Sequence, residues 1–163
     1  MPKRAKLSAS AEDYLKAIYQ LEVRDGAAAN HELARQLNLS PPSVTGMLQR
    51  LTASGLALRH ADHRVQLTTE GRRVARRTLR QHQILACYLT AVLGFSREDA
   101  HNEVERMVRA SSDELIDRMA AAIGEPTSDP HSVPIPAREC AAEPNVDSPA
   151  PPIYVGAATT HQQ

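Results

Sequence analysis

The chain has 163 residues, enough for one compact domain with a subdomain or tail, and its five aromatic residues leave a core that must be aliphatic. No apolar run approaches the ~20 residues of a membrane span, no signal-peptide pattern follows the basic start, and two distant cysteines support neither a disulfide framework nor a thiolate metal cluster. The net charge of zero hides an asymmetry, because residues 1–83 hold 14 Lys and Arg against 7 Asp and Glu, whereas residues 84–163 hold 5 against 12. We therefore expect a cytoplasmic protein that makes no membrane contact and has a basic, polyanion-binding first half.

Helical periodicity and capping residues predict three helices and a hairpin at the start of the chain. Ser10 and Asp13 have the spacing of a capping box, and Ser40 followed by Pro41 has the residue types that begin a helix. Two short β-type runs joined by a polar turn predict the hairpin. We expect helices over about 10–24, 30–37 and 41–54, and strands over 56–60 and 65–68.

Three more helices are predicted before a proline-rich tail. Thr68, Ser96 and Ser112 are the expected N-caps of helices over about 69–93, 97–110 and 113–123. From Glu125 onward the chain carries 8 of its 11 prolines and few periodic apolar residues, which predicts disorder. The predicted division is a DNA-binding domain over 1–72, a helical domain over 73–124 and a tail over 125–163.

The order helix, helix, turn, helix and hairpin is typical of a winged helix-turn-helix, a DNA-binding module. Apolar residues of the 41–54 helix face the core, so hydroxyl and amide side chains near its start face outward, where they can meet phosphates and base edges in a major groove. The hairpin turn offers an arginine for a neighbouring backbone contact. The candidate DNA-binding residues are Ser40, Pro42, Ser43, Thr45, Gly46, Gln49, Arg50 and Arg64.

Five arginines on one broad arc of the 69–93 helix form a further basic stripe. Such a stripe can follow DNA phosphates, but a charge run is usually a solvated helix face, and both interpretations stay open here. The stripe consists of Arg72, Arg73, Arg76, Arg77 and Arg80.

Five motifs occur in order over about residues 8–137: SAEDYLKAIYQLE, ELARQLNLSPPSVTGMLQRLTASGL, VQLTTEGRRVA, LRQHQILACYLTAVLGFSREDAHNEVE and DPHSVPIP. Together they resemble the diphtheria toxin repressor family of iron- or manganese-responsive bacterial repressors. The resemblance implies a mainly α fold, in which a winged helix-turn-helix DNA-binding domain precedes an all-helical dimerisation domain with metal sites between them. Many members add a C-terminal SH3-like domain, which we expect to be absent because only the proline-rich tail follows.

The resemblance also implies a metal site for Mn²⁺ or Fe²⁺, of which this sequence retains part. The positions that match family ligands and hold metal-binding side chains are Asp13, His82, His101 and Glu105. Four other matching positions hold residues that do not bind metal in this way, namely Lys16, Ala86, Val108 and Arg109. The predicted site is therefore partly degenerate.

Each retained residue also has a purely structural interpretation. Asp13 can complete its capping box, and His82 can be a hydrogen-bonded core histidine. Glu105 can form an ion pair with Arg109, four residues later on the same helix. Lys16 and Arg109 would then neutralise Asp13 and Glu105 as a metal would, and the protein would bind DNA without metal.

The sequence therefore predicts a homodimeric transcriptional repressor of the metal-responsive type, which binds a palindromic DNA operator. The expected dimer surface is an apolar stripe formed by Leu85, Leu89, Val92 and Leu93, together with parts of the first and the last predicted helices; some of the stripe must be intramolecular core. The alternative is a winged-helix regulator that is metal-independent or responds to a small organic ligand. A metal buffer would need more ligands, and no phosphate loop, nucleophile elbow or metal-hydrolase motif indicates an enzyme.

Overall fold

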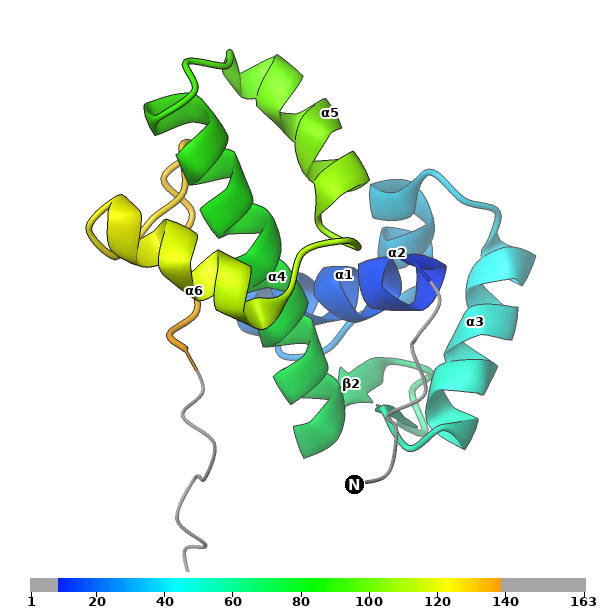
Figure 1. Ribbon diagram of the computed structural model, residues 1–163. Coiled ribbons are helices and arrows are strands. Elements are labelled where there is room, and N and C mark those ends of the chain that lie inside the picture. Colours follow the sequence, from blue (N-terminus) through cyan, green and yellow to red (C-terminus); the bar gives the residue numbers. More distant parts are fainter. Residues whose placement is uncertain (1–8, 139–163) are drawn as a thin grey trace, which may run out of the picture.

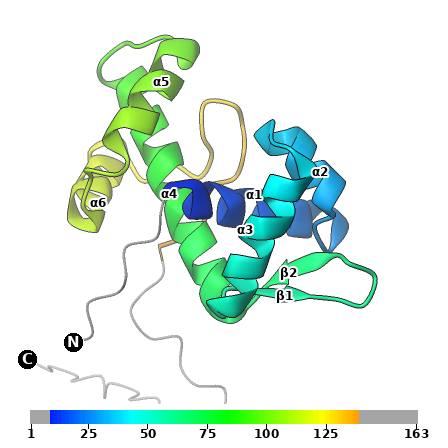
Figure 2. The same ribbon diagram turned by 90° about the vertical axis from the view of Figure 1, so that its right-hand side faces the viewer.

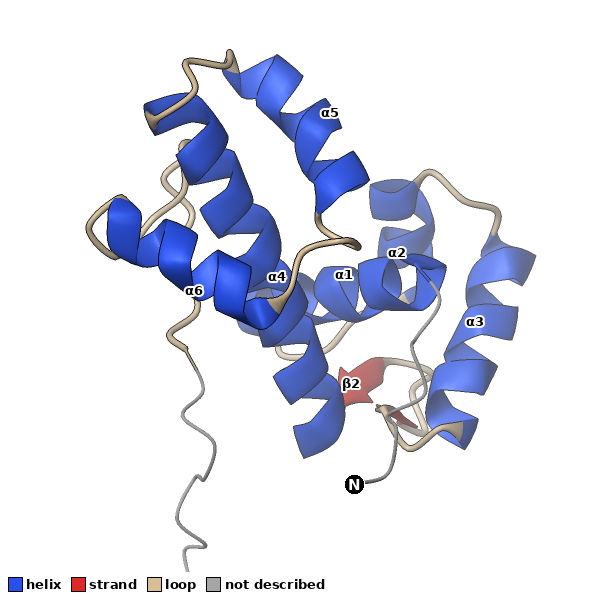
Figure 3. Cartoon of the chain, viewed as in Figure 1, coloured by secondary structure: helices blue, strands red, loops and turns tan. Residues whose placement is uncertain are grey.

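The computed structural model describes residues 9–138, in which six helices and one two-stranded antiparallel hairpin follow the predicted order (Figures 1 and 3). The winged helix-turn-helix and the helical part that follows it are both present, so the predicted fold class is confirmed. The elements are α1 (Ala9–Asp25), α2 (Asn30–Leu37), α3 (Pro41–Ala53), β1 (Ala57–Arg59), β2 (Val65–Leu67), α4 (Thr69–Ala91), α5 (Arg97–Met107) and α6 (Asp113–Ala122).

Three of the six helices in the described chain begin after a hydroxyl side chain that accepts a backbone hydrogen bond. Thr68 accepts from the Gly71 amide at 3.0 Å, and Ser96 and Ser112 cap α5 and α6 in the same way. Ser40 precedes α3 with an extended backbone, but its hydroxyl is hydrogen-bonded to the Ser43 hydroxyl and caps no amide. The structure describes α1 from Ala9 onward, but the side chain of Ser10 lies outside the described part of the chain, so the capping box at the start of α1 stays a prediction.

The first core is built by α1, α2, α3, the hairpin and the beginning of α4. Aliphatic side chains fill it, as the composition predicted, with Leu15, Ile18 and Leu33 fully buried. In the hairpin Ala57 pairs with Leu67 and Arg59 with Val65. Val65 also exchanges two backbone hydrogen bonds of 2.8 Å with Ala28 before α2, so the hairpin is anchored to the helix-turn-helix.

The junction between the hairpin and α4 depends on Gly71. This glycine is buried in the first turn of α4, and a Cβ atom there would lie 1.9 Å from the Leu56 carbonyl oxygen. The same oxygen accepts a hydrogen bond from the Thr68 amide at 3.1 Å. The missing side chain therefore lets α4 pack directly on the hairpin backbone.

The second core lies at the other end of α4, where α5 and α6 pack against it (Figures 1 and 2). Figure 2 shows α5 and α6 on one side of the molecule and α2, α3 and the hairpin on the other, with α4 running between the two groups. Leu85 and Leu89 are buried in this core, so the prediction that they form a dimer surface is wrong. Val92 and Leu93, from the same stripe, are exposed.

Residues 125–138 contradict the predicted disorder, because they fold back onto α4. The Gln83 side chain, 4% exposed, donates to Asp129 Oδ2 at 3.2 Å and to the carbonyl oxygen of Pro134 at 3.3 Å. Asp129 in turn accepts hydrogen bonds from two amides of its own loop, and Ile135 packs against the second core. Proline content alone gave the wrong prediction for these residues, because side chains of α4, distant in sequence, form hydrogen bonds with polar groups of the loop. Residues 139–163 of the predicted tail lie outside the described residues.

None of the helices within residues 9–138 is long and apolar enough to span a membrane.

Candidate functional site

The start of α3 presents a polar outer face, as expected from its periodicity. Val44, Met47, Leu48 and Leu51 are buried beneath the helix. Ser40, Pro42, Ser43, Gln49 and Arg50 are exposed, so five of the predicted DNA-binding residues share one accessible surface.

Thr45 and Gly46 are less accessible than these five residues. The Thr45 hydroxyl donates to the Pro41 carbonyl at 3.1 Å and accepts from Asn30 Nδ2 at 3.3 Å, so both of its hydrogen-bonding roles are already used. Gly46 has open space where a Cβ atom would lie, because no other part of the described chain packs there. Thr45 therefore holds α2 and α3 together, and Gly46 leaves a bare backbone on the outer face of α3.

Arg64 is directed toward the protein. Its guanidinium donates to the Ala27 carbonyl at 3.0 Å and to the Asp25 carbonyl at 3.4 Å, across the hairpin from α3. These bonds hold the hairpin on the loop between α1 and α2, and the DNA contact of Arg64 stays a prediction. At the hairpin turn, His63 is exposed and has a φ of 64°.

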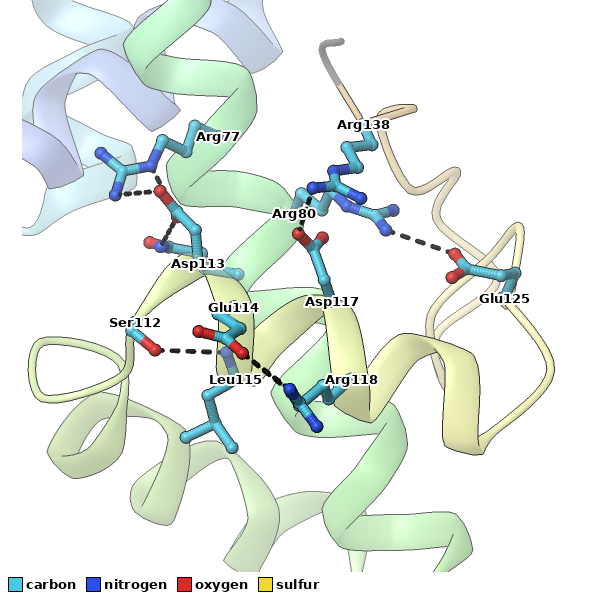
Figure 4. A network of polar contacts seen from close by, with 11 residues as sticks. Arg77, Arg80, Ser112, Asp113, Glu114, Leu115, Asp117, Arg118, Glu125 and Arg138 are labelled. Carbon is cyan, nitrogen blue, oxygen red and sulfur yellow. Dashed lines mark hydrogen bonds and ion pairs between the residues drawn. The ribbon is translucent and has the colours of Figure 1, made fainter. Parts of the chain in front are cut away.

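Three of the five arginines in the stripe of α4 pair with carboxylates from other elements, and Arg73 pairs with Glu70 of α4 itself. Near the start of α4, Arg72 donates to Glu22 of α1, a carboxylate whose side chain is only 6% exposed, at 3.2 Å. Figure 4 shows the next part of the stripe, where Arg77 meets Asp113 of α6 at 2.7 Å and Arg80 meets Glu125 at 3.4 Å. These arginines cross-link α4 to α1, α6 and the loop that follows, which neither sequence interpretation anticipated.

The same network holds residues 125–138 against α6. Arg138 reaches Asp117 of α6 (Figure 4), with 2.9 Å between Arg138 Nη2 and Asp117 Oδ2. Asp113 also accepts a hydrogen bond from Gln81 at 2.8 Å. Arg80, whose side chain is 12% exposed, donates to the Pro136 carbonyl as well. The helical part is therefore braced by ion pairs as well as by its apolar core.

Three of the four predicted metal ligands meet between α1, α4 and α5. Ligand atoms of Asp13, His82 and Glu105 all lie within 4.8 Å of one another, and each side chain is partly buried. Asp13 lies on α1 of the first core, and Glu105 lies on α5 of the second core. His82 lies on α4, the helix that joins the two cores.

His82 is neutral at pH 7. Burial, and to a smaller extent the positive charges of Lys16, His101 and Arg109, lower the pKa of its imidazole to about 3. Its Nδ1 atom lies 3.4 Å from Glu105 Oε1, so at neutral pH this contact joins a neutral ring to a carboxylate and is no ion pair. A neutral imidazole and two carboxylates are a donor set that fits Mn²⁺, Fe²⁺ or Zn²⁺.

His101 does not join this cluster. It is exposed on α5 and lines the same cleft as His82, while the ligand atoms that converge belong to the other three residues. Asp129 and His131 also line this cleft, and sequence reasoning missed both because it assigned them to a disordered tail.

The two cations predicted to replace a metal behave differently. Lys16 Nζ lies 3.6 Å from Asp13 Oδ1, so the predicted neutralisation of Asp13 is present. Arg109 is exposed, and within the described chain Glu105 forms no ion pair with it. The i, i+4 spacing of Glu105 and Arg109 allowed a pair, but the Glu105 carboxylate instead faces His82 across the helix interface.

Comparisons with known proteins agree with this architecture. Residues 6–64 match the N-terminal DNA binding domain of the iron dependent repressor, and residues 68–137 match its metal binding and dimerisation domain. The iron-dependent repressor IdeR of Mycobacterium tuberculosis is 30% identical over 125 residues, which are 77% of this chain and 54% of that protein. The diphtheria toxin repressor of Corynebacterium diphtheriae is 29% identical over 149 residues, which are 91% of this chain and 66% of that protein. The chain thus spans between about half and two thirds of the length of these relatives.

Solved structures show the same likeness. The manganese regulator SloR superposes with a TM-score of 0.71 at 29% identity, covering 80% of this chain and 61% of that one. IdeR of T. acidophilum superposes with a TM-score of 0.69 at 29% identity, covering 87% of this chain and 65% of that one. Because the two matched domains belong to one family and together run from residue 6 to residue 137, the chain belongs to the iron-dependent repressor family, which includes the diphtheria toxin repressor.

Proposed function

We propose that this protein is a homodimeric, metal-responsive transcriptional regulator, which binds a double-stranded DNA operator in the cytoplasm and is not an enzyme. The observation that carries the proposal is the meeting of Asp13, His82 and Glu105 between the DNA-binding part and the helical part. The names of its relatives support it, since they include iron-dependent repressors and a manganese regulator.

The candidate ligands would couple the two parts of the chain. Asp13 lies on α1, the helix that carries the fully buried Leu15 and Ile18 of the first core. Glu105 lies next to Val104 of the second core. The two carboxylates repel each other when nothing positive lies between them. A bound Mn²⁺ or Fe²⁺ would supply positive charge to both carboxylates, and the neutral ring of His82 would offer a nitrogen ligand to the same ion. His101, on the wall of the cleft, is a candidate additional ligand.

The DNA contact is assigned to the outer face of α3. Its exposed Ser43 and Gln49 can bond to phosphates and base edges, and the helix N-terminus carries partial positive charge that suits a phosphate. Ser40, Pro42 and Arg50 flank these two residues. For the dimer we propose the exposed apolar residues of the helical part, of which Val92, Leu93 and Phe95 are 50%, 56% and 38% exposed. A twofold dimer would present two copies of α3 to a palindromic site.

In vitro selection from a random duplex library, followed by fluorescence anisotropy with the selected duplex, tests the proposal. With Mn²⁺ present the affinity should rise at least about tenfold over the chelator-treated protein, which corresponds to a coupling of ~1.4 kcal/mol. The variant Gln49→Ala should weaken binding in both conditions, whereas Asp13→Ala should remove only the response to Mn²⁺. Equal affinity with Mn²⁺ and with chelator would favour the metal-independent alternative, and no duplex selected in either condition would contradict DNA binding.

A further inference from the structure

Lys16 lies beside the candidate metal cluster, on the same helix as one of its ligands. Its ammonium is 3.6 Å from Asp13 Oδ1, and its side chain is only 21% exposed. It also lines the cleft that contains His82 and His101. Its position within the cluster is therefore different from that of the exposed surface lysines that usually pair with a carboxylate in solvent.

The ammonium and a divalent cation would have to use the same carboxylate. Asp13 is one of the three converging ligands found in the described chain, so a cation held there must approach the carboxylate that Lys16 now neutralises. A divalent ion about 4 Å from an ammonium is disfavoured on the order of 30-fold even with the full screening of water, and more strongly in a partly buried site. The lysine stem is long and flexible, so the ammonium can turn toward the mouth of the cleft.

We propose that Lys16 is a built-in competitor of the metal ion: its ammonium neutralises Asp13 in the metal-free protein and must leave that carboxylate before a divalent cation is held there. This inference rests on the proposed metal response, and it adds that one residue of the chain sets the metal concentration at which the response begins. The metal-free state is then protected from repulsion between Asp13 and Glu105, and the metal-bound state requires Lys16 in a second position.

The second cation near the site does not have this role. Arg109 is exposed and makes no ion pair with Glu105 in the part of the chain that the structure describes, so its charge acts only from a distance. Removing Lys16 should therefore change metal affinity much more than removing a charge elsewhere. This contrast allows a matched control.

Calorimetric titration of the full chain, stripped of metal by chelator, with Mn²⁺ tests the inference. Lys16→Met keeps the length of the stem and removes the charge, and it should bind Mn²⁺ at least about tenfold more tightly than the wild type. Lys16→Arg keeps the charge and should bind like the wild type or more weakly. Arg118→Gln removes one charge from a pair that is 77% and 74% exposed on α6, and it should leave the affinity unchanged.

Thermal melting supplies a readout that does not depend on DNA. Lys16→Met should melt lower than the wild type in chelator and show a larger upward shift on addition of Mn²⁺, because two carboxylates then lack their counter-ion until metal binds. Adding Asp13→Ala to Lys16→Met should abolish the gained affinity, which would place the gain at this cluster.

The outcomes separate the inference from the function on which it rests. Tighter binding by Lys16→Met, or binding by Lys16→Met where the wild type binds nothing, supports the competition. If the wild type and Lys16→Met bind Mn²⁺ with equal affinity, the competition is overturned and the metal response is left intact. No binding by either protein would overturn both.

Discussion

Replacing Gly71 by alanine places one methyl group where α4 meets the hairpin backbone. The new Cβ atom would lie 1.9 Å from the Leu56 carbonyl oxygen and 3.3 Å from the Cβ of Leu67. Because such contacts require about 3.0 Å, the carbonyl has to retreat by roughly 1 Å. That movement also strains the 3.1 Å hydrogen bond that the carbonyl accepts from Thr68.

The energetic terms have opposite signs. Overpacking of this kind costs about 1–3 kcal/mol, and weakening a backbone hydrogen bond adds about 1 kcal/mol. Alanine in a helix interior recovers about 1 kcal/mol relative to glycine. We therefore expect Gly71→Ala to lower the free energy of unfolding by about 2 kcal/mol, which is a fall of about 4–8 °C in Tm for a chain of this size.

Gly46 of α3 is the matched control, because the same substitution meets nothing there. Apart from the neighbouring backbone of α3, no atom of residues 9–138 lies within 4 Å of a Cβ built at Gly46, so Gly46→Ala should raise the free energy of unfolding by about 0.5–1 kcal/mol. Urea unfolding followed by circular dichroism measures both variants. A Gly71→Ala variant as stable as Gly46→Ala would refute the close approach of α4 to the hairpin.

Two further predictions concern buried ionisable side chains, those of His82 and Glu22. The pKa of His82 is about 3 in the folded chain and 6.5 in the unfolded chain, so below pH 6.5 the unfolded chain binds more protons than the folded one. In chelator, the free energy of unfolding should therefore fall by about 2 kcal/mol between pH 8 and pH 5. This loss grows until about pH 3. His82→Gln should flatten that slope in urea titrations, and an unchanged slope would show that the folded imidazole titrates normally. Glu22→Ala should cost about 2–3 kcal/mol, because the buried carboxylate accepts from the Leu67 amide at 2.7 Å and from Arg72 at 3.2 Å. Glu114→Ala, which breaks a solvent-exposed pair, should cost less than about 0.5 kcal/mol in the same assay, and equal losses would contradict the role given to Glu22.

The order and approximate ends of the helices could be predicted from sequence because they depend on near neighbours. Thr68, Ser96 and Ser112 cap the helices that follow them through bonds to amides three residues away. The outer face of α3 followed from periodicity alone, since Val44 and Leu48 had to be buried together.

Contacts between distant residues could not be predicted in this way. The sequence identified Arg64 and Arg77 as cations at the surface, but each also binds a partner more than 30 residues away, and only the packing of the elements brings those partners near. Residues 125–138 read as a disordered tail for the same reason, because Gln83 and Arg80 of α4, which satisfy their polar groups, lie about 50 residues earlier.

The candidate metal site shows both contributions. Sequence determined which side chains have metal-binding chemistry and that Lys16 and Arg109 stand among them. The tertiary structure decided that Asp13, His82 and Glu105 converge while His101 stays on the wall of the cleft. It also decided that Lys16 meets Asp13 and that Arg109 remains in solvent. The physical reason is that spacing along one helix permits a contact, whereas the direction in which the packed helices turn each side chain selects which contact forms.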